Sequence, residues 1–195
     1  MIGEIDMDQI LKDIVRFEEF RIPNEKEPKK MTELLKSVKI VLFYWGANWC
    51  KVCQYFGPKL IDFYQKINIP GKDKVMEVLY YSFDKEETEF EKSCKENPWL
   101  HFSLRNEKAE MMRERLEVHG IPFVTVFKWE NSKLKLITKN GRMDIQRVKE
   151  KAFDLWLEGK TTEEDDFKIE EKKPEKVEEK KLENIEEKKE AKGPN

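Results

Sequence analysis

The chain has 195 residues, enough for one domain with its own hydrophobic core and further segments at its ends. Charged residues make up 40% of it and hydrophobic residues 38%, which is too polar for a chain that folds throughout. Basic and acidic residues number 38 and 40, so the net charge of −2 provides no long-range field toward nucleic acid or an acidic membrane surface. The sequence shows neither a signal peptide nor an apolar run near the roughly 18 residues of a membrane span. We therefore expect a cytoplasmic protein that binds neither nucleic acid nor membrane.

Three regions are expected along the chain. Residues 1–20 place apolar side chains at helical spacing behind an acidic start, which predicts an amphipathic helix, and the two prolines within residues 21–30 indicate a linker. Residues 31–159 carry the strand and helix signals of the main domain. From residue 160 to 195, blocks of glutamate and lysine with few apolar side chains predict a solvated tail, or a segment that folds onto a partner.

Within the main domain, strand and helix signals alternate. The run KIVLFYW is β-branched and aromatic, and it is short enough for a central strand buried on both faces. The alternation, followed by two strands joined by the turn ENS, predicts an α/β fold whose mixed central sheet is flanked by helices. Strands are expected at residues 39–45, 75–84, 122–129 and 133–141, and helices at residues 31–38, 53–67, 86–97, 108–120 and 143–159.

Two cysteines, Cys50 and Cys53, lie where the first buried strand gives way to a helical pattern. A thiol at a helix N-terminus faces unpaired backbone N–H groups and the positive end of the helix dipole, which favour the thiolate. Cys50 would occupy this position, and Cys53, one turn later, is near enough to attack a mixed disulfide formed on Cys50. The odd total of three cysteines fits a reducing compartment, where such a pair is more often catalytic or metal-binding than structural.

Two other interpretations of the pair are open. A zinc site needs four ligands, and the remaining candidates are Cys94, His101 and His119, without a second Cys-x-x-Cys. Two inert buried thiols are the other alternative, although the neighbouring Trp49 and Lys51 fit poorly in a closed core. We expect Cys94 to be a bystander in a polar helix and His119 to lie at a helix end. The pattern favours a redox pair without a metal.

The segment FYWGANWCKVCQYFGPKLIDFYQKI resembles the active-site segment of thioredoxin-fold proteins, and more closely that of their tryparedoxin and nucleoredoxin branch. Trp49 directly precedes the first cysteine, and Pro58 falls where family members kink the active-site helix. Pro122, in GIPFV, matches the loop whose cis-proline faces the disulfide. Tyr44 occupies the position of the buried acid of ordinary thioredoxins, as aromatic residues do in tryparedoxins. The resemblance covers about residues 39–142.

This resemblance implies a thiol-disulfide oxidoreductase of thioredoxin-like fold that reduces disulfides of proteins or small molecules. Cys50 would attack the substrate disulfide, and Cys53 would then expel the reduced product. No cofactor is implied beyond the redox-active Cys50–Cys53 disulfide. The residues expected to contact the substrate flank the pair, and they are Trp49, Lys51, Ile121 and Pro122.

Some features depart from the family pattern. Lys51-Val52 stands between the cysteines where Pro-Pro or Gly-Pro is typical, and Phe123 follows Pro122 where threonine is common. The N-terminal helix and the charged C-terminal tail lie outside the resemblance and imply an attachment role. A rival hypothesis is therefore a thioredoxin-like structural or regulatory subunit of a large assembly, such as a ciliary, axonemal or cytoskeletal complex, held by these extensions.

Overall fold

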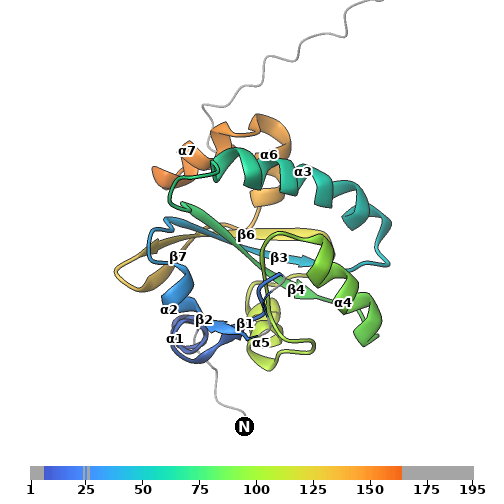
Figure 1. The fold of residues 1–195 in the computed structure, drawn as a ribbon. Helices are drawn as coiled ribbons and strands as arrows, with labels where there is room; N and C mark the ends of the chain where they lie inside the picture. The colour runs from blue at the N-terminus through green and yellow to red at the C-terminus, as the bar shows by residue number, and fades with distance from the viewer. Residues whose placement is uncertain (1–6, 24, 26, 164–195) are drawn as a thin grey trace, which may run out of the picture. The chain divides into compact units, whose positions relative to one another are not determined.

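The structure is a computed structural model, and it describes residues 7–23, 25 and 27–163. Its centre is a five-stranded sheet with the strand order β5-β4-β3-β6-β7 (Figure 1). Strands β3, β4 and β5 run parallel, whereas β6 and β7 are antiparallel to their neighbours, so the sheet is mixed as expected. The strands are β3 (Ile40–Gly46), β4 (Met76–Ser82), β5 (Leu100–His101), β6 (Phe123–Glu130) and β7 (Lys133–Thr138).

The central strand is β3, and every one of its residues is buried. Its apolar run is explained by its place in the sheet, because it pairs with β4 on one side and β6 on the other and is covered by helices on both faces. The parallel β3–β4 pair needs a crossover, which α3 (Lys51–Ile67) provides. Helix α3 therefore begins beside the C-terminal end of β3, and this junction is where the cysteine pair lies.

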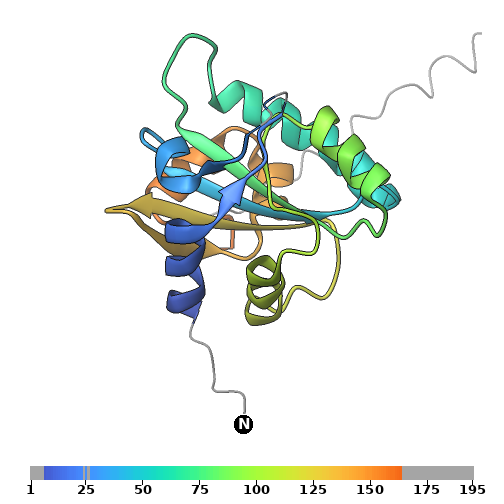
Figure 2. The same cartoon turned by 60° about the horizontal axis from the view of Figure 1, so that its bottom comes forward.

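Helices cover both faces of the sheet (Figures 1 and 2). Apolar side chains of α3, α6 (Gly141–Val148) and α7 (Lys151–Leu157) share one core cluster. Those of α1 (Met7–Phe17), α2 (Met31–Leu34) and α5 (Glu107–Arg115) share the cluster on the opposite face. The remaining helix is α4 (Glu87–Glu96). Within the described residues, no helix combines the length and the apolar composition needed to cross a membrane.

The N-terminal helix is part of the domain rather than a segment that precedes it. Ile10 and Ile14 of α1 are buried in the same cluster as Phe43 of β3. In place of the expected linker, β1 (Glu19–Phe20) and β2 (Lys29–Lys30) form a short antiparallel pair. Because the apolar face of α1 is already buried in this way, it is not available for attachment to a partner.

The C-terminal part of the domain also differs from the expectation. The structure has two helices, α6 and α7, where one was expected at residues 143–159. Lys149 adopts a φ of 52°, which ends α6 before α7 begins. The fold continues beyond residue 160, since Thr162 is buried and bonded to Asp144 of α6. Residues 164–195 of the tail expected at 160–195 lie outside the described residues, as do the first six residues of the expected N-terminal helix.

Two smaller differences have local causes. Strand β5 was not expected, because two residues are too few to show a periodicity. Helix α5 ends at Arg115 rather than near Gly120, because Glu117 has a φ of 57°, outside the helical range. His119 is consequently in the connection that follows the helix and not at its end.

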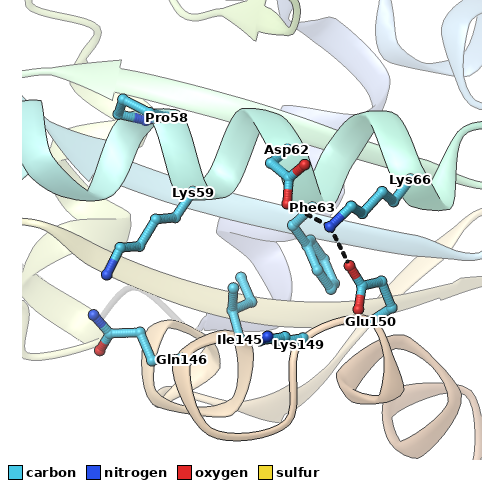
Figure 3. A pocket seen from close by; sticks show the side chains of 9 residues that line it. All are labelled: Pro58, Lys59, Asp62, Phe63, Lys66, Ile145, Gln146, Lys149 and Glu150. Atoms are coloured by element: carbon cyan, nitrogen blue, oxygen red, sulfur yellow. Dashed lines mark ion pairs between the residues drawn. The ribbon is translucent and has the colours of Figure 1, made fainter.

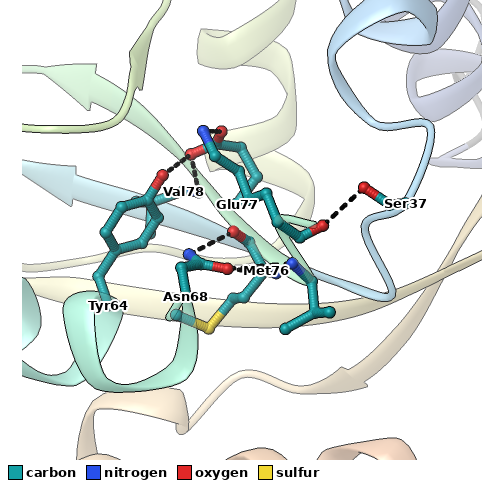
Figure 4. A network of polar contacts seen from close by, with 8 residues as sticks. Ser37, Tyr64, Asn68, Met76, Glu77 and Val78 are labelled. Atoms are coloured by element: carbon teal, nitrogen blue, oxygen red, sulfur yellow. Dashed lines mark hydrogen bonds and ion pairs between the residues drawn. The ribbon is translucent and has the colours of Figure 1, made fainter. Parts of the chain in front are cut away.

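A buried carboxylate joins the end of α3 to the start of β4 (Figure 4). Glu77 is 1% exposed and accepts hydrogen bonds from the hydroxyl of Tyr64, at 3.1 Å, and from the ammonium of Lys74, at 2.7 Å. Asn68, which follows α3, donates its amide N–H to the carbonyl of Met76 at 2.8 Å. Burial raises the pKa of Glu77, and Lys74 opposes this shift. The network fixes where the crossover helix returns to the sheet.

Candidate active site

The sulfur of Cys50 lies at the N-terminus of α3. Cys50 is the N-cap residue, with extended φ and ψ of −81° and 109°, and its Sγ accepts a hydrogen bond of 3.2 Å from the backbone N–H of Cys53. A donor at a helix N-terminus stabilises negative charge on the accepting atom. On its other side the Cys50 thiol faces the carbonyl oxygen of Ile121 at 3.9 Å. The side chain is 8% exposed, so only a small part of it meets solvent.

Cys53 has a different environment. It is 4% exposed, and burial, followed by its hydrogen bond with Cys50, raises the pKa of its thiol to about 12. Hydrogen bonds with the backbone of Ala47 and with the hydroxyl of Tyr44 oppose part of this shift. Both cysteines are free thiols in this structure. At neutral pH Cys53 therefore keeps its proton while Cys50 holds the position at the helix N-terminus.

Tyr44 lies behind the pair within an aromatic cluster. Its ring centre is 5.1 Å from that of Tyr80 and 5.9 Å from that of Phe56. Burial raises the pKa of Tyr44 as well, so its hydroxyl remains a donor. The absence of a side chain at Gly46 makes room for this hydroxyl, since a Cβ there would lie 2.9 Å from the tyrosine oxygen. A cavity of about 300 Å³ between α3 and α4 reaches both Tyr44 and Cys53.

The loop before β6 forms the opposite wall of the site. The Ile121–Pro122 bond is cis, which confirms the expectation drawn from the resemblance. Ile121 packs against the cluster that contains both cysteines. The guanidinium of Arg142, at the start of α6, donates to the carbonyl of Pro122 at 3.4 Å and lies 5.9 Å from the ring centre of Phe56. Arg142 was not found from the sequence, where no local pattern separates it from the other basic residues.

The loop before Cys50 is held by a second residue that sequence reasoning did not assign to the site. Asp84 is 4% exposed and accepts hydrogen bonds from the backbone N–H of Asn48, at 2.8 Å, and from the hydroxyls of Ser82 and Ser93, at 2.7 and 3.3 Å. The sequence does place Asp84 directly after a strand. This position indicates nearness to the site, because the C-terminal ends of parallel strands meet at one edge of a sheet.

The structure brings together Cys50, Cys53 and Ile121, with Pro122 next in the same loop, whereas Trp49 and Lys51 lie at the rim. Trp49 is 55% exposed, and its indole N–H donates to the carbonyl of Phe83 at 3.4 Å. Lys51 is the exposed first residue of α3. All of the residues expected to contact a substrate therefore surround the cysteine pair.

The alternative zinc ligands are not brought together. Among the residues that the structure describes, no three His, Cys, Asp or Glu side chains form a group that could hold a metal ion. Cys94 is on α4 beside Arg21, and burial raises the pKa of its thiol to about 11. His101 is fully buried in β5, and burial lowers its pKa to about 4. Neither belongs to the site around Cys50.

A mixed sheet, a Cys-x-x-Cys pair at the start of the crossover helix and a cis-proline loop against it together define a thioredoxin fold. The profile of the family described as thioredoxin-like matches residues 37–134, half of the chain. The chain belongs to the thioredoxin-like family, near its tryparedoxin and nucleoredoxin branch.

Individual relatives and structures agree with this assignment. Mouse nucleoredoxin is 29% identical over 103 residues, which cover 52% of this chain and 22% of that protein. Human nucleoredoxin-like protein 1 is 25% identical over 138 residues, or 68% of this chain and 64% of that protein. The crystal structure of tryparedoxin I from Crithidia fasciculata is similar with a TM-score of 0.60 and 26% identity, covering 73% of this chain and 92% of that one. The chain thus spans about a fifth of mouse nucleoredoxin but almost the whole of a tryparedoxin.

Proposed function

We propose that the protein is a thiol-disulfide oxidoreductase that reduces disulfides of proteins or small molecules through Cys50 and Cys53. The observation that carries this proposal is the placement of the Cys50 sulfur between the N–H of Cys53 and the carbonyl of Ile121. The N–H stabilises a thiolate, and Cys50, which is 8% exposed against 4% for Cys53, is the cysteine that a substrate reaches first. Cys53 is more deeply buried, and it is protonated until the second exchange.

The reaction proceeds in two exchanges. The Cys50 thiolate attacks one sulfur of the substrate disulfide, so that a mixed disulfide forms and the other substrate sulfur leaves as a thiolate that takes a proton from solvent. Cys53 then loses its proton to solvent and attacks the Cys50 sulfur, forming the Cys50–Cys53 disulfide and releasing the second substrate thiol. Two electrons pass from the protein to the substrate, and an external dithiol returns the pair to its reduced form.

The surrounding residues have distinct roles in this scheme. Trp49 covers one side of the sulfur, and Lys51 adds positive charge near it. Ile121 and Pro122 present backbone groups with which an extended substrate segment can pair. The reaction requires no bound cofactor, and it fits a reducing compartment such as the cytoplasm, where an external dithiol can regenerate the pair.

The test is the reduction of bis(2-hydroxyethyl) disulfide and of insulin by the full chain, with a dithiol as the terminal reductant. Cys50→Ser should abolish turnover of both substrates, and Cys94→Ser should leave it unchanged because Cys94 lies outside the site. No turnover by the unmodified chain, or equal turnover by Cys50→Ser, would contradict the proposal.

A further inference from the structure

A line of exposed side chains runs along one side of α3, beginning two residues after Cys50. Val52 is 49% exposed and Tyr55 is 67% exposed, and Lys59 follows them one turn later. Spacings of three and four residues place all three on the same face of a helix. Large apolar side chains with so much exposed surface, in the first turns of the helix that Cys50 caps, form a surface suited to contact with an apolar group.

The positive charge on this line is not neutralised. The ammonium of Lys59 lies 4.0 Å from the ring centre of Tyr55, which holds it in place over the aromatic face. Neither Lys51 nor Lys59 forms an ion pair with a carboxylate of the described residues. A partner carboxylate would therefore meet a positioned and unpaired ammonium at Lys59.

The line continues into a groove of about 470 Å³ between α3 and α6 (Figure 3). Phe63 of α3 and Ile145 of α6 point toward each other from its two walls, with 2% and 5% of their surface exposed, and Pro58 adds apolar surface. Lys59 and Gln146 lie at one end of the groove, so the ammonium that ends the exposed line also marks the entrance to the groove.

The far end of the groove is closed by an ion-pair cluster. Lys66 contacts Asp62 at 2.7 Å and Glu150 at 2.8 Å (Figure 3), so its charge is already balanced. An acidic group is thus favoured at Lys59 and not at Lys66, and between them the groove offers the apolar surface of Pro58, Phe63 and Ile145 beside the exposed Lys149. The preferred groups therefore follow in a fixed order along α3, with an acidic group at Lys59 and an apolar group further along the groove.

We propose that this line and groove form a docking track for a polypeptide segment of the disulfide-bearing substrate. The inference rests on the proposed function and specifies its substrate class as proteins. Tyr55, Lys59 and Phe63 follow Cys50 by five, nine and thirteen residues, or about 8, 14 and 20 Å of helix. An extended chain that rises about 3.3 Å per residue covers these lengths in about two, four and six residues.

The substrate segment therefore has a defined pattern. Counted from the attacked cysteine, it carries an apolar side chain at about the second residue, a carboxylate at the fourth and an apolar side chain at the sixth. These even offsets share one face of an extended strand, so all three groups can contact α3 at once. A small thiol cannot span the roughly 20 Å from Cys50 to the groove.

The test uses a peptide with one cysteine in mixed disulfide with 2-mercaptoethanol, leucine two and six residues away and glutamate four residues away on both sides, and serine elsewhere. A second peptide replaces glutamate with glutamine, and a third replaces leucine with serine. For the full chain, kcat/KM is expected to fall about threefold with glutamine, the value of an exposed ion pair. It is expected to fall about tenfold or more with serine.

Variants of the protein identify the residues that cause these preferences among the peptides. Lys59→Glu should remove the preference for the glutamate peptide, and Tyr55→Ser should reduce the preference for leucine. The matched controls are Lys72→Glu and Ile69→Ser, at exposed residues beyond the end of α3, and both should keep the preferences of the unmodified chain.

Equal kcat/KM values for the three peptides, alongside turnover of bis(2-hydroxyethyl) disulfide, would overturn the docking track and leave the proposed function standing. Preferences that survive both Lys59→Glu and Tyr55→Ser would also overturn it. If the unmodified chain reduces none of these disulfides, the proposed function itself fails, and the docking track fails with it.

Discussion

The hydroxyl of Thr162 donates a hydrogen bond of 2.5 Å to the carboxylate of Asp144, and the backbone N–H of Thr162 donates a second bond of 3.1 Å to the same oxygen. Asp144 is fully buried, and its other oxygen accepts the indole N–H of Trp156 at 2.8 Å. A buried carboxylate needs such donors, because an unpaired charge in the interior is strongly unfavourable. Residues after α7 are therefore part of the folded domain.

A chain that ends at Gly159 should be less stable than one that ends at Glu163. The shorter chain lacks both Thr162 donors, and the expected loss is about 1–3 kcal/mol of the free energy of unfolding. Denaturant unfolding of the two truncated chains measures the difference. In the full chain Thr162→Val should cause a smaller loss in the same direction, whereas Thr161→Val should stay within about 0.5 kcal/mol. Equal stability of the two truncated chains would show that Asp144 does not depend on Thr162.

Cys53→Ser should accumulate mixed disulfides with substrate, because the first exchange takes place and the second cannot. Cys50→Ser should accumulate none, since the remaining thiol of Cys53 is buried and its pKa is raised to about 12. Non-reducing electrophoresis with mass spectrometry of the adducts distinguishes the two variants. Equal trapping by both would mean that Cys50 is not the attacking thiol.

Mild acid should destabilise the protein through His101. Its pKa is lowered from 6.5 to about 4 in the folded state, chiefly by burial, so the unfolded chain binds the proton more readily between these values. Its contribution to stability is complete above pH 6.5 and is lost as the pH falls toward 4, by about 3 kcal/mol at most.

Unfolding free energies measured from pH 7 to pH 4 check this expectation. His101→Phe, which places a ring among the aromatic neighbours Tyr80 and Phe90, should flatten the profile. The exposed His119 is the control, and His119→Gln should leave the profile as it is. A His101→Phe profile with the original slope would assign the acid sensitivity to other groups.

Glu77→Ala should cost about 2–3 kcal/mol of unfolding free energy. The substitution removes the acceptor of the buried Tyr64 hydroxyl and of Lys74, and leaves a void at the junction of α3 and β4 (Figure 4). Thermal or denaturant unfolding measures the loss. Glu96→Ala, at an exposed residue whose nearest ion pair spans 3.8 Å, should change stability by less than about 0.5 kcal/mol. A loss for Glu77→Ala no larger than this control would show that the network adds little.

Much of this protein could be predicted from local sequence. The apolar run that became β3, the helical spacing of α3 and the turn before β7 each depend on neighbouring residues, and all are found in the structure. The cysteine pair was located in the same way, because a strand followed at once by a helix fixes which residue stands at the helix N-terminus. The thioredoxin-like fold followed from the resemblance around these residues and is confirmed.

Contacts between residues that are distant in the chain could be found only in the tertiary structure. The sequence places residue 84 directly after a strand but does not show that its carboxylate holds the loop before Cys50, and nothing near residue 142 shows that its guanidinium reaches the carbonyl of Pro122. The amphipathic pattern of α1 gave its apolar face but not the surface that this face would cover, which proved to be the protein's own core. Periodicity records which side of an element is apolar, whereas the partner of that side is set by packing across the whole fold.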